Sequence, residues 1–194
     1  CKEMCGIFGF FLFDKSNDLN EHSLKLATES LKHRGPDANG SWFSEKDGIY
    51  LGHRRLSILD LSNKGNQPMI SNCGRFVITF NGEIYNYREL ALYLKTKYRL
   101  EFKNGTDTTV LLELISKFGL KKTLSLIEGM FAFALWDKKI KKLYIARDRF
   151  GEKPLFYYRN SSFLMFSSEL KAIKALCGPK LKISSNSSFY YSLL

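Results

Sequence analysis

Several features typical of membrane, secreted and metal-binding proteins are absent from these 194 residues. No run approaches the ~18 consecutive apolar residues of a membrane-spanning helix, and the apolar stretch from Cys5 to Phe13 lacks the basic residues and cleavage site of a signal peptide. The four cysteines include no CxxC pair, and the three histidines are not spaced as zinc ligands. We therefore expect a soluble cytoplasmic protein without disulfides or a metal site.

The composition is that of one folded domain, because 44% of the residues are hydrophobic in a chain of ordinary domain length. The net charge of +11 is high enough to raise the possibility of a nucleic-acid partner. Much of this charge lies in Asp137–Lys142, a segment without aromatic residues between two strand-like runs. We interpret this segment as a solvated hairpin turn, with a surface for an acidic partner as the alternative.

Hydrophobic periodicity predicts blocks of strands and helices rather than strict alternation. The expected strands are 6–13, 49–51, 56–59, 76–80, 131–136, 143–146, 155–158 and 163–167. The expected helices are 21–33, 87–97, 108–118 and 169–176, with a loop at 34–40, a turn at Asn81-Gly82 and Asp107 as an N-cap. Blocks of this kind favour antiparallel sheets covered by helices, which is an α+β fold.

Two short motifs carry candidate chemistry. Cys5-Gly6 begins a buried strand, and a cysteine that is the first residue of a chain has an α-amine that can act as a base for its own thiol. Asn81-Gly82 combines a side-chain amide with an unobstructed backbone N–H, the two donors that an oxyanion needs. The plain alternatives are a core cysteine and an ordinary turn.

Three charged residues outside these motifs fit an amino-acid substrate. Arg55 can pair with a carboxylate in bidentate geometry, Asp107 at a helix start can receive an ammonium group, and Glu83 beside Asn81-Gly82 adds a carboxylate. A surface arginine and a helix cap are the plain alternatives. Together with the thiol, these groups match a free α-amino acid with a side-chain amide, which describes glutamine or asparagine.

Six or more ordered sequence blocks resemble the glutaminase domain of glutamine-hydrolysing asparagine synthetases. The blocks are MCGIFG at 4–9, HRGPD at 33–37, GHRRLSILD at 52–60, NGEIYN at 81–86, GTDT at 105–108, GMFAFA at 129–134, RDRFGEKPL at 147–155 and SELKA at 168–172. Other class II amidotransferases share the Cys-Gly start but differ at HRGPD and NGEIYN.

The resemblance implies a four-layer α-β-β-α sandwich of the N-terminal-nucleophile hydrolase type. It also implies hydrolysis of glutamine through a cysteinyl thioester. The implied catalytic residues are Cys5, Asn81 and Gly82. The implied glutamine-binding residues are Arg55, Leu56, Ser57, Ile58, Leu59, Asn81, Gly82, Glu83 and Asp107.

By the same resemblance, residues 4–176 form the glutaminase domain and 177–194 begin a linker to a synthetase module that is not in this sequence. Residues 1–3 are an extension, and we expect Met4 to be the initiator that is trimmed before Cys5. The domain itself needs no cofactor, whereas ATP and magnesium serve the synthetase module. That module, absent or in trans, would amidate aspartate or a related acceptor.

Two other functions stay open at this stage. One is an inactive descendant that binds glutamine or a partner without hydrolysis. The other is a nucleic-acid-binding module that uses the C-terminal charge, although the resemblance implies neither a nucleic acid nor a membrane as partner. Oligomeric state is left open.

Overall fold

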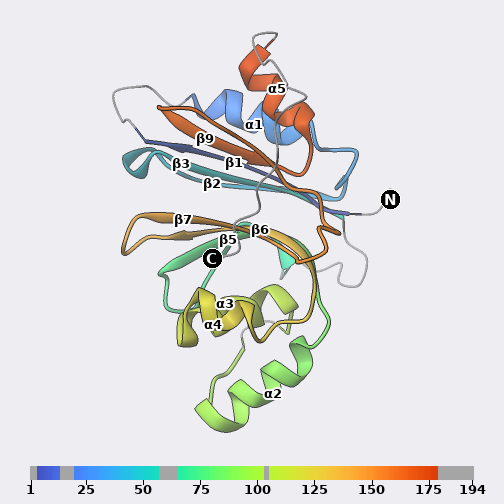
Figure 1. Cartoon of the computed structure of the whole chain (residues 1–194), viewed down its shortest axis with the longest axis vertical. Coiled ribbons are helices and arrows are strands. Elements are labelled where there is room, and N and C mark those ends of the chain that lie inside the picture. Colours follow the sequence, from blue (N-terminus) through green and yellow to red (C-terminus); the bar gives the residue numbers. More distant parts are fainter. Residues whose placement is uncertain (1–3, 14–19, 57–64, 103–104, 179–194) are drawn as a thin grey trace.

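The chain forms two antiparallel sheets packed face to face between two helical layers, as the computed structural model shows (Figure 1). The structure describes residues 4–13, 20–56, 65–102 and 105–178. Four layers follow one another in the order helices, sheet, sheet, helices. This arrangement confirms the predicted α-β-β-α sandwich.

The first sheet has the strand order β2-β3-β1-β9-β8 and is covered by α1 and α5. Its strands are β1 (Gly6–Leu12), β2 (Ala38–Ser44), β3 (Ile49–Arg55), β8 (Phe156–Arg159) and β9 (Phe163–Ser167). The covering helices are α1 (Glu21–Glu29) and α5 (Leu170–Cys177), and a short 3-10 turn, Glu45–Asp47, joins β2 to β3.

The second sheet has the order β4-β5-β6-β7, and α3 packs on its outer side next to α4, whereas α2 packs against α3 farther from the sheet (Figure 1). Its strands are β4 (Met69–Ile70), β5 (Phe76–Ile84), β6 (Gly129–Asp137) and β7 (Lys142–Arg147). The helices are α2 (Tyr87–Tyr98), α3 (Asp107–Phe118) and α4 (Leu120–Leu124).

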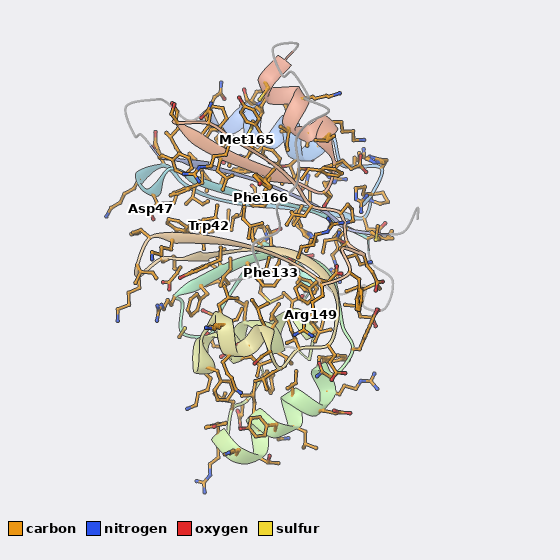
Figure 2. The ribbon with its side chains drawn as sticks, viewed as in Figure 1. Trp42, Asp47, Phe133, Arg149, Met165 and Phe166 are labelled. Carbon is orange, nitrogen blue, oxygen red and sulfur yellow. The ribbon has the colours of Figure 1, made fainter. Side chains whose placement is uncertain are left out.

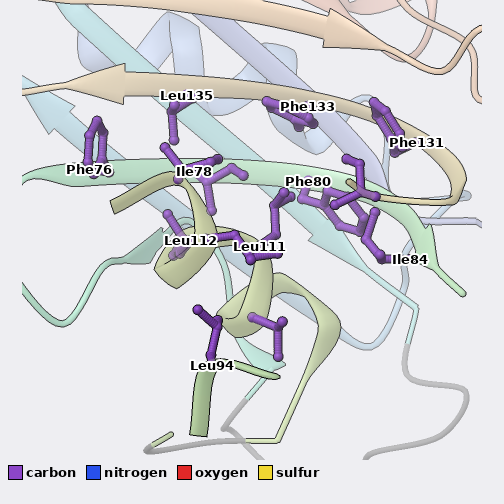
Figure 3. Packing of buried hydrophobic residues seen from close by; sticks show 14 residues of the cluster. Phe76, Ile78, Phe80, Ile84, Leu94, Leu111, Leu112, Phe131, Phe133 and Leu135 are labelled. Carbon is purple, nitrogen blue, oxygen red and sulfur yellow. The ribbon is translucent and has the colours of Figure 1, made fainter. Parts of the chain in front are cut away.

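Strand β6 shows why both faces of a central strand are apolar here. Ala132, Ala134 and Trp136 pack into the cluster between the sheets, where Phe166 of β9 also lies. The alternate residues Phe131, Phe133 and Leu135 pack toward the helices, as Figure 3 shows. Figure 2 places Trp42 and Phe166 on the first sheet and Phe133 on the second. A strand buried on both faces has no polar alternation.

Several sequence predictions are confirmed with small shifts in their bounds. The strands at 6–13, 76–80, 131–136, 143–146, 155–158 and 163–167 and the four predicted helices are present. Asp137–Lys142 is the β6–β7 turn, in which the Asp137 carboxylate accepts from the Lys139 and Ile140 N–H groups. Within the described residues, no helix is long and apolar enough to cross a membrane.

Four predictions are wrong in detail, two of them because long-range strand pairing overrides local signals. Asn81 and Gly82 form no turn but continue β5, paired with Ala132 and Phe131. The loop expected at 34–40 ends at residue 37, where β2 begins to pair with β3. The first helix ends at Glu29, earlier than predicted.

The fourth correction concerns the cap of α3. Thr106, and not Asp107, is its N-cap, and its hydroxyl accepts from the Thr109 N–H at 3.3 Å. A strand was also expected at 56–59. Leu56 lies just after the end of β3 and is not in a strand, and residues 57–59 lie outside the described residues.

Candidate active site

Cys5 lies directly before β1, facing the end of β3. The register pairs Gly6 with Arg54, and the Cys5 sulfur lies 3.5 Å from the Leu56 backbone nitrogen. Burial raises the pKa of the Cys5 thiol, whereas the Leu56 N–H and the positive charges of Arg55 and Arg34 act to lower it. Ionisation of this thiol therefore depends on the charges and bases around it.

The loop after α1 is hydrogen-bonded to the Cys5 backbone through Arg34. The guanidinium of Arg34 donates through Nε to the Cys5 carbonyl at 3.2 Å and through Nη1 to Glu169 Oε1 at 3.1 Å. Gly35 allows this loop to touch β3, because a Cβ there would lie 2.4 Å from the Arg54 carbonyl carbon. The sequence blocks contain Arg34 and Glu169, but the link between them is visible only in the fold.

Asn81 points from β5 toward the first sheet. Thr79, two residues earlier on the same strand face, donates to the Gly52 carbonyl of β3 at 3.1 Å. The Asn81 side chain is 1% exposed, and its amide nitrogen has no hydrogen-bond partner among the described residues. A buried, unpartnered donor is costly in a folded protein and marks a place where a ligand can accept.

The registers bring Asn81 and Cys5 to the same end of the two sheets. His53 of β3 contacts the Phe80 carbonyl of β5 at 3.2 Å, which aligns the two strands across the sandwich. After His53, β3 continues to Arg54, which pairs with Gly6, the residue after Cys5. After Phe80, β5 continues to Asn81.

The backbone N–H of Gly82 points away from β6. Phe131, its partner in the register, directs its own N–H and carbonyl to Asp148 instead. On the same edge of β5 the Phe80 N–H donates to Gln67 Oε1 at 2.6 Å and the Ile84 N–H to Asp107 Oδ2 at 3.1 Å. Because N–H groups alternate along a strand, the Gly82 N–H lies between these two on that edge.

The structure brings the two predicted acidic residues together. Asp107 accepts from the Ile84 and Thr108 N–H groups, and Glu83 is exposed on the adjacent position of β5. Burial raises the pKa of Asp107, and the Glu83 charge adds to this effect, while the two N–H donors oppose it.

Arg55 ends β3 and is 9% exposed. It donates through Nη1 to Asn66 Oδ1 at 3.1 Å, and Gly65 packs against its guanidinium. Leu56 follows it and contacts the thiol, whereas Ser57, Ile58 and Leu59 lie outside the described residues. Sequence reasoning missed Gly65 and Asn66, for which the Gly-Asn-Gln-Pro run was the available signal.

The segment 147–153 also reaches the site. The Asp148 carboxylate accepts from the N–H groups of Phe150, Glu152 and Lys153, and its own N–H donates to the Phe131 carbonyl at 2.7 Å. Lys153 is buried, and its Nζ lies 2.9 Å from Met4 Sδ. Sequence reasoning assigned no role to Lys153, although it lies in one of the blocks.

Neither a metal site nor a charged histidine is found near these residues in the described part of the chain. No group of three or more His, Cys, Asp or Glu side chains there could hold a metal ion. Burial lowers the pKa of His53 to about 4, so its imidazole is neutral at physiological pH and contacts the Phe80 carbonyl.

Comparisons with known sequences agree with this geometry. A family model for the glutamine amidotransferase domain matches residues 4–192. A putative asparagine synthetase 2 of Methanocaldococcus jannaschii is 41% identical over 189 residues, which cover 89% of this chain and 35% of that protein. Asparagine synthetase 2 of Bacillus subtilis is 40% identical over 172 residues, covering 88% and 22%. The chain thus spans about a third or less of the length of these relatives.

Comparison with solved structures identifies the fold as N-terminal-nucleophile hydrolase-like. Glutamine phosphoribosylpyrophosphate amidotransferase of B. subtilis superposes with a TM-score of 0.74 at 20% identity, covering 89% of this chain and 44% of that one. The allosteric regulatory enzyme of purine biosynthesis superposes with a TM-score of 0.75 at 21% identity, covering 89% and 43%. The chain therefore belongs to the class II glutamine amidotransferase domain family and resembles the N-terminal domain of asparagine synthetases.

Proposed function

We propose that this domain hydrolyses the side-chain amide of glutamine with Cys5 as the nucleophile. The observation that carries the proposal is the buried side-chain amide of Asn81. Its nitrogen has no hydrogen-bond partner in the described part of the chain, and the side chain points toward the first sheet, where Cys5 directly precedes β1. A tetrahedral oxyanion would supply the missing acceptor.

The reaction begins with transfer of the Cys5 thiol proton to the α-amine of the same residue. The thiolate sulfur then bonds to the side-chain carbonyl carbon of glutamine, and the carbonyl oxygen becomes an oxyanion. Asn81 Nδ2 and the Gly82 N–H donate to this oxyanion. The α-ammonium returns its proton to the leaving nitrogen, the C–N bond breaks, and ammonia departs from a glutamyl thioester.

Water completes the cycle. The α-amine accepts a proton from water as the water oxygen bonds to the thioester carbon. The C–S bond breaks, the thiol regains a proton, and glutamate is released. The base exists only if Cys5 carries a free α-amine, so the proposal requires Cys5 to be the first residue of the active chain.

The charged residues around the site suit the α-carbon end of glutamine. The Arg55 guanidinium would bind the α-carboxylate, and Asp107 and Glu83 would bind the α-ammonium group. Leu56 and the neighbouring Ser57, Ile58 and Leu59 would line the pocket through their backbone groups. The domain would need no cofactor for this step.

The released ammonia would serve an ATP- and magnesium-dependent synthetase module that amidates aspartate or a related acceptor. The support for this step is similarity to asparagine synthetases, of whose length this chain covers 35% or less. We propose a cytoplasmic location, where glutamine, ATP and such a module would meet.

The test is glutamate release from glutamine by a chain that begins at Cys5. Cys5→Ala should abolish release and the acid-stable acyl adduct detected by mass spectrometry of the wild-type protein. Cys73→Ala is the matched control, since Cys73 is exposed in the β4–β5 hairpin, and it should retain full activity.

A wild-type chain with a verified Cys5 amine and no glutamate release would refute the proposal. Saturable glutamine binding by calorimetry without turnover would then favour the inactive, binding-only alternative.

A further inference from the structure

Glu169 is linked to the Cys5 backbone through one guanidinium group, that of Arg34. Arg34 donates through Nε to the Cys5 carbonyl at 3.2 Å and through Nη1 to Glu169 Oε1 at 3.1 Å. The Arg34 side chain is 10% exposed, and its third nitrogen, Nη2, is buried with no hydrogen-bond partner among the described residues. The Cys5 carbonyl and the Glu169 carboxylate are thus the two described acceptors that determine where this guanidinium lies.

The backbone on either side of Glu169 is itself held to β1. The Ser168 N–H donates to the Ile7 carbonyl at 2.9 Å, and the Ser168 hydroxyl accepts from the Ile7 N–H at 3.0 Å. The Glu169 N–H donates to Ser167 Oγ at 3.2 Å, and Glu169 is the N-cap of α5 in an extended conformation. The junction between β9 and α5 therefore presents the carboxylate at a fixed position beside the start of β1.

Two further cations hold the carboxylate from its outer side. His33 Nε2 lies 2.8 Å from Glu169 Oε1, and Lys171 Nζ lies 3.5 Å from Oε2. Lys171 Nζ also lies 2.8 Å from His33 Nδ1. An ammonium group can only donate, so Nδ1 accepts and the ring hydrogen on Nε2 points to the carboxylate. Groups other than Arg34 therefore fix the carboxylate, which can in turn orient the guanidinium.

The Cys5 carbonyl is the part of the nucleophile residue that this link reaches. In a chain that begins at Cys5, the residue has one covalent neighbour, Gly6, and terminal residues are poorly ordered unless they are tied down. A tilt of the peptide group between Cys5 and Gly6 would move the Cys5 Cα, and with it both the amine and the thiol. The hydrogen bond from Arg34 Nε to the carbonyl opposes this tilt.

We propose that Glu169 is a positioning residue of the glutaminase site, which orients the Arg34 guanidinium so that the Cys5 carbonyl, and with it the nucleophile, stays in place. This inference rests on the proposed function. A displacement of about 1 Å in a reacting group can lower a rate by about 100-fold. Because Glu169 acts through the Cys5 backbone and not through glutamine, its loss should change kcat more than KM.

The experiment compares two variants of nearly equal size in chains that begin at Cys5. Glu169→Met removes the acceptor for Arg34, and kcat for glutamate release should fall by about 10- to 100-fold while KM changes by less than about threefold. Glu169→Gln keeps an acceptor oxygen for Arg34 Nη1, and its kcat should stay within about threefold of the wild type. Glu169→Ala replaces Glu169→Met if circular dichroism shows that the latter does not fold.

A double-mutant cycle separates this role from a general effect on structure. Arg34→Met should lower kcat at least as much as Glu169→Met, and the double variant should lose no more than Arg34→Met alone, because the carboxylate acts through the guanidinium. Arg75→Met is the matched control. It breaks the Arg75–Asp137 ion pair of 2.6 Å, about 20 Å along β5 from Asn81, and should keep the wild-type kcat.

Two results would overturn the inference alone, given an active wild type. One is a folded Glu169→Met protein with the wild-type kcat, and the other is a double variant in which the two losses multiply. A wild-type chain with a verified Cys5 amine and no glutamate release would instead refute the proposed function, and the inference would fall with it.

Discussion

The Asn81 side chain illustrates how one residue can be explained by chemistry and not by stability. Its amide nitrogen is buried without a partner in the described part of the chain, an arrangement that costs about 1–3 kcal/mol relative to a satisfied group. Asn86, five residues later, is the opposite case, because it donates to the Leu126 carbonyl and accepts from the Glu128 N–H. One asparagine is available for a ligand and the other is used by the fold.

We therefore expect Asn81→Ala to lower activity and Asn86→Ala to lower stability. Asn81→Ala should lower kcat for glutamine hydrolysis by about 10²–10³-fold with little loss of stability, as for other oxyanion donors. Asn86→Ala should leave kcat nearly unchanged and lower the free energy of unfolding by about 1–2 kcal/mol. Steady-state kinetics and urea denaturation measure the two quantities, and equal kcat values for the two variants would contradict the assignment of Asn81.

At the scale of elements, β5 and β6 show how close packing selects glycine. A Cβ on Gly82 would lie 2.3 Å from the Met130 carbonyl oxygen and 2.7 Å from the Phe131 Cα, distances that no side chain tolerates. The Asn-Gly pair, which is a common turn signal, here lies inside a strand because β6 pairs along its whole length. Gly82 allows β5 and β6 to approach closely, and its own N–H stays accessible on the opposite edge of β5.

Gly82→Ala should therefore lower the free energy of unfolding by about 1–3 kcal/mol, the usual range for overpacking. Gly105→Ala is the matched control, since a Cβ there would meet nothing within 4 Å, and its stability should stay within about 0.5 kcal/mol of the wild type. Chemical denaturation compares the variants. Equal stabilities would show that the strands move apart at little cost.

For the whole molecule, the interface between the two sheets is the central stabilising layer. Trp136 is fully buried there, in the same cluster as Ile7 of β1 and Phe166 of β9. Its indole N–H has no hydrogen-bond partner among the residues that the structure describes. The tryptophan therefore contributes through its volume and apolar area, and its polar atom opposes folding.

From this balance we expect Trp136→Phe to stay within about 1 kcal/mol of the wild type, because the small cavity is offset by removal of the unsatisfied N–H. Trp136→Ala should lower the free energy of unfolding by about 3–5 kcal/mol. Thermal and urea unfolding distinguish the two. A large loss in Trp136→Phe would mean that the indole nitrogen has a favourable partner.

The sequence by itself determined the class of the fold and the positions of most elements. Periodicity along β6 or α3 is a local property, so it can be read from consecutive residues. The same holds for the motifs, since Cys5-Gly6 and Asn81-Gly82 are contiguous. The family match over residues 4–192 confirms that they belong to a glutamine amidotransferase domain.

Only the tertiary structure decided what depends on residues distant in the chain. The pairing of β2 with β3, the continuation of β5 through Asn81 and the hydrogen bonds of Arg34 to Cys5 and Glu169 join segments separated by many residues. Local propensity carries no information about such neighbours. For that reason the strand at Asn81 and the buried cation beside Cys5 became visible only when the two sheets were packed together.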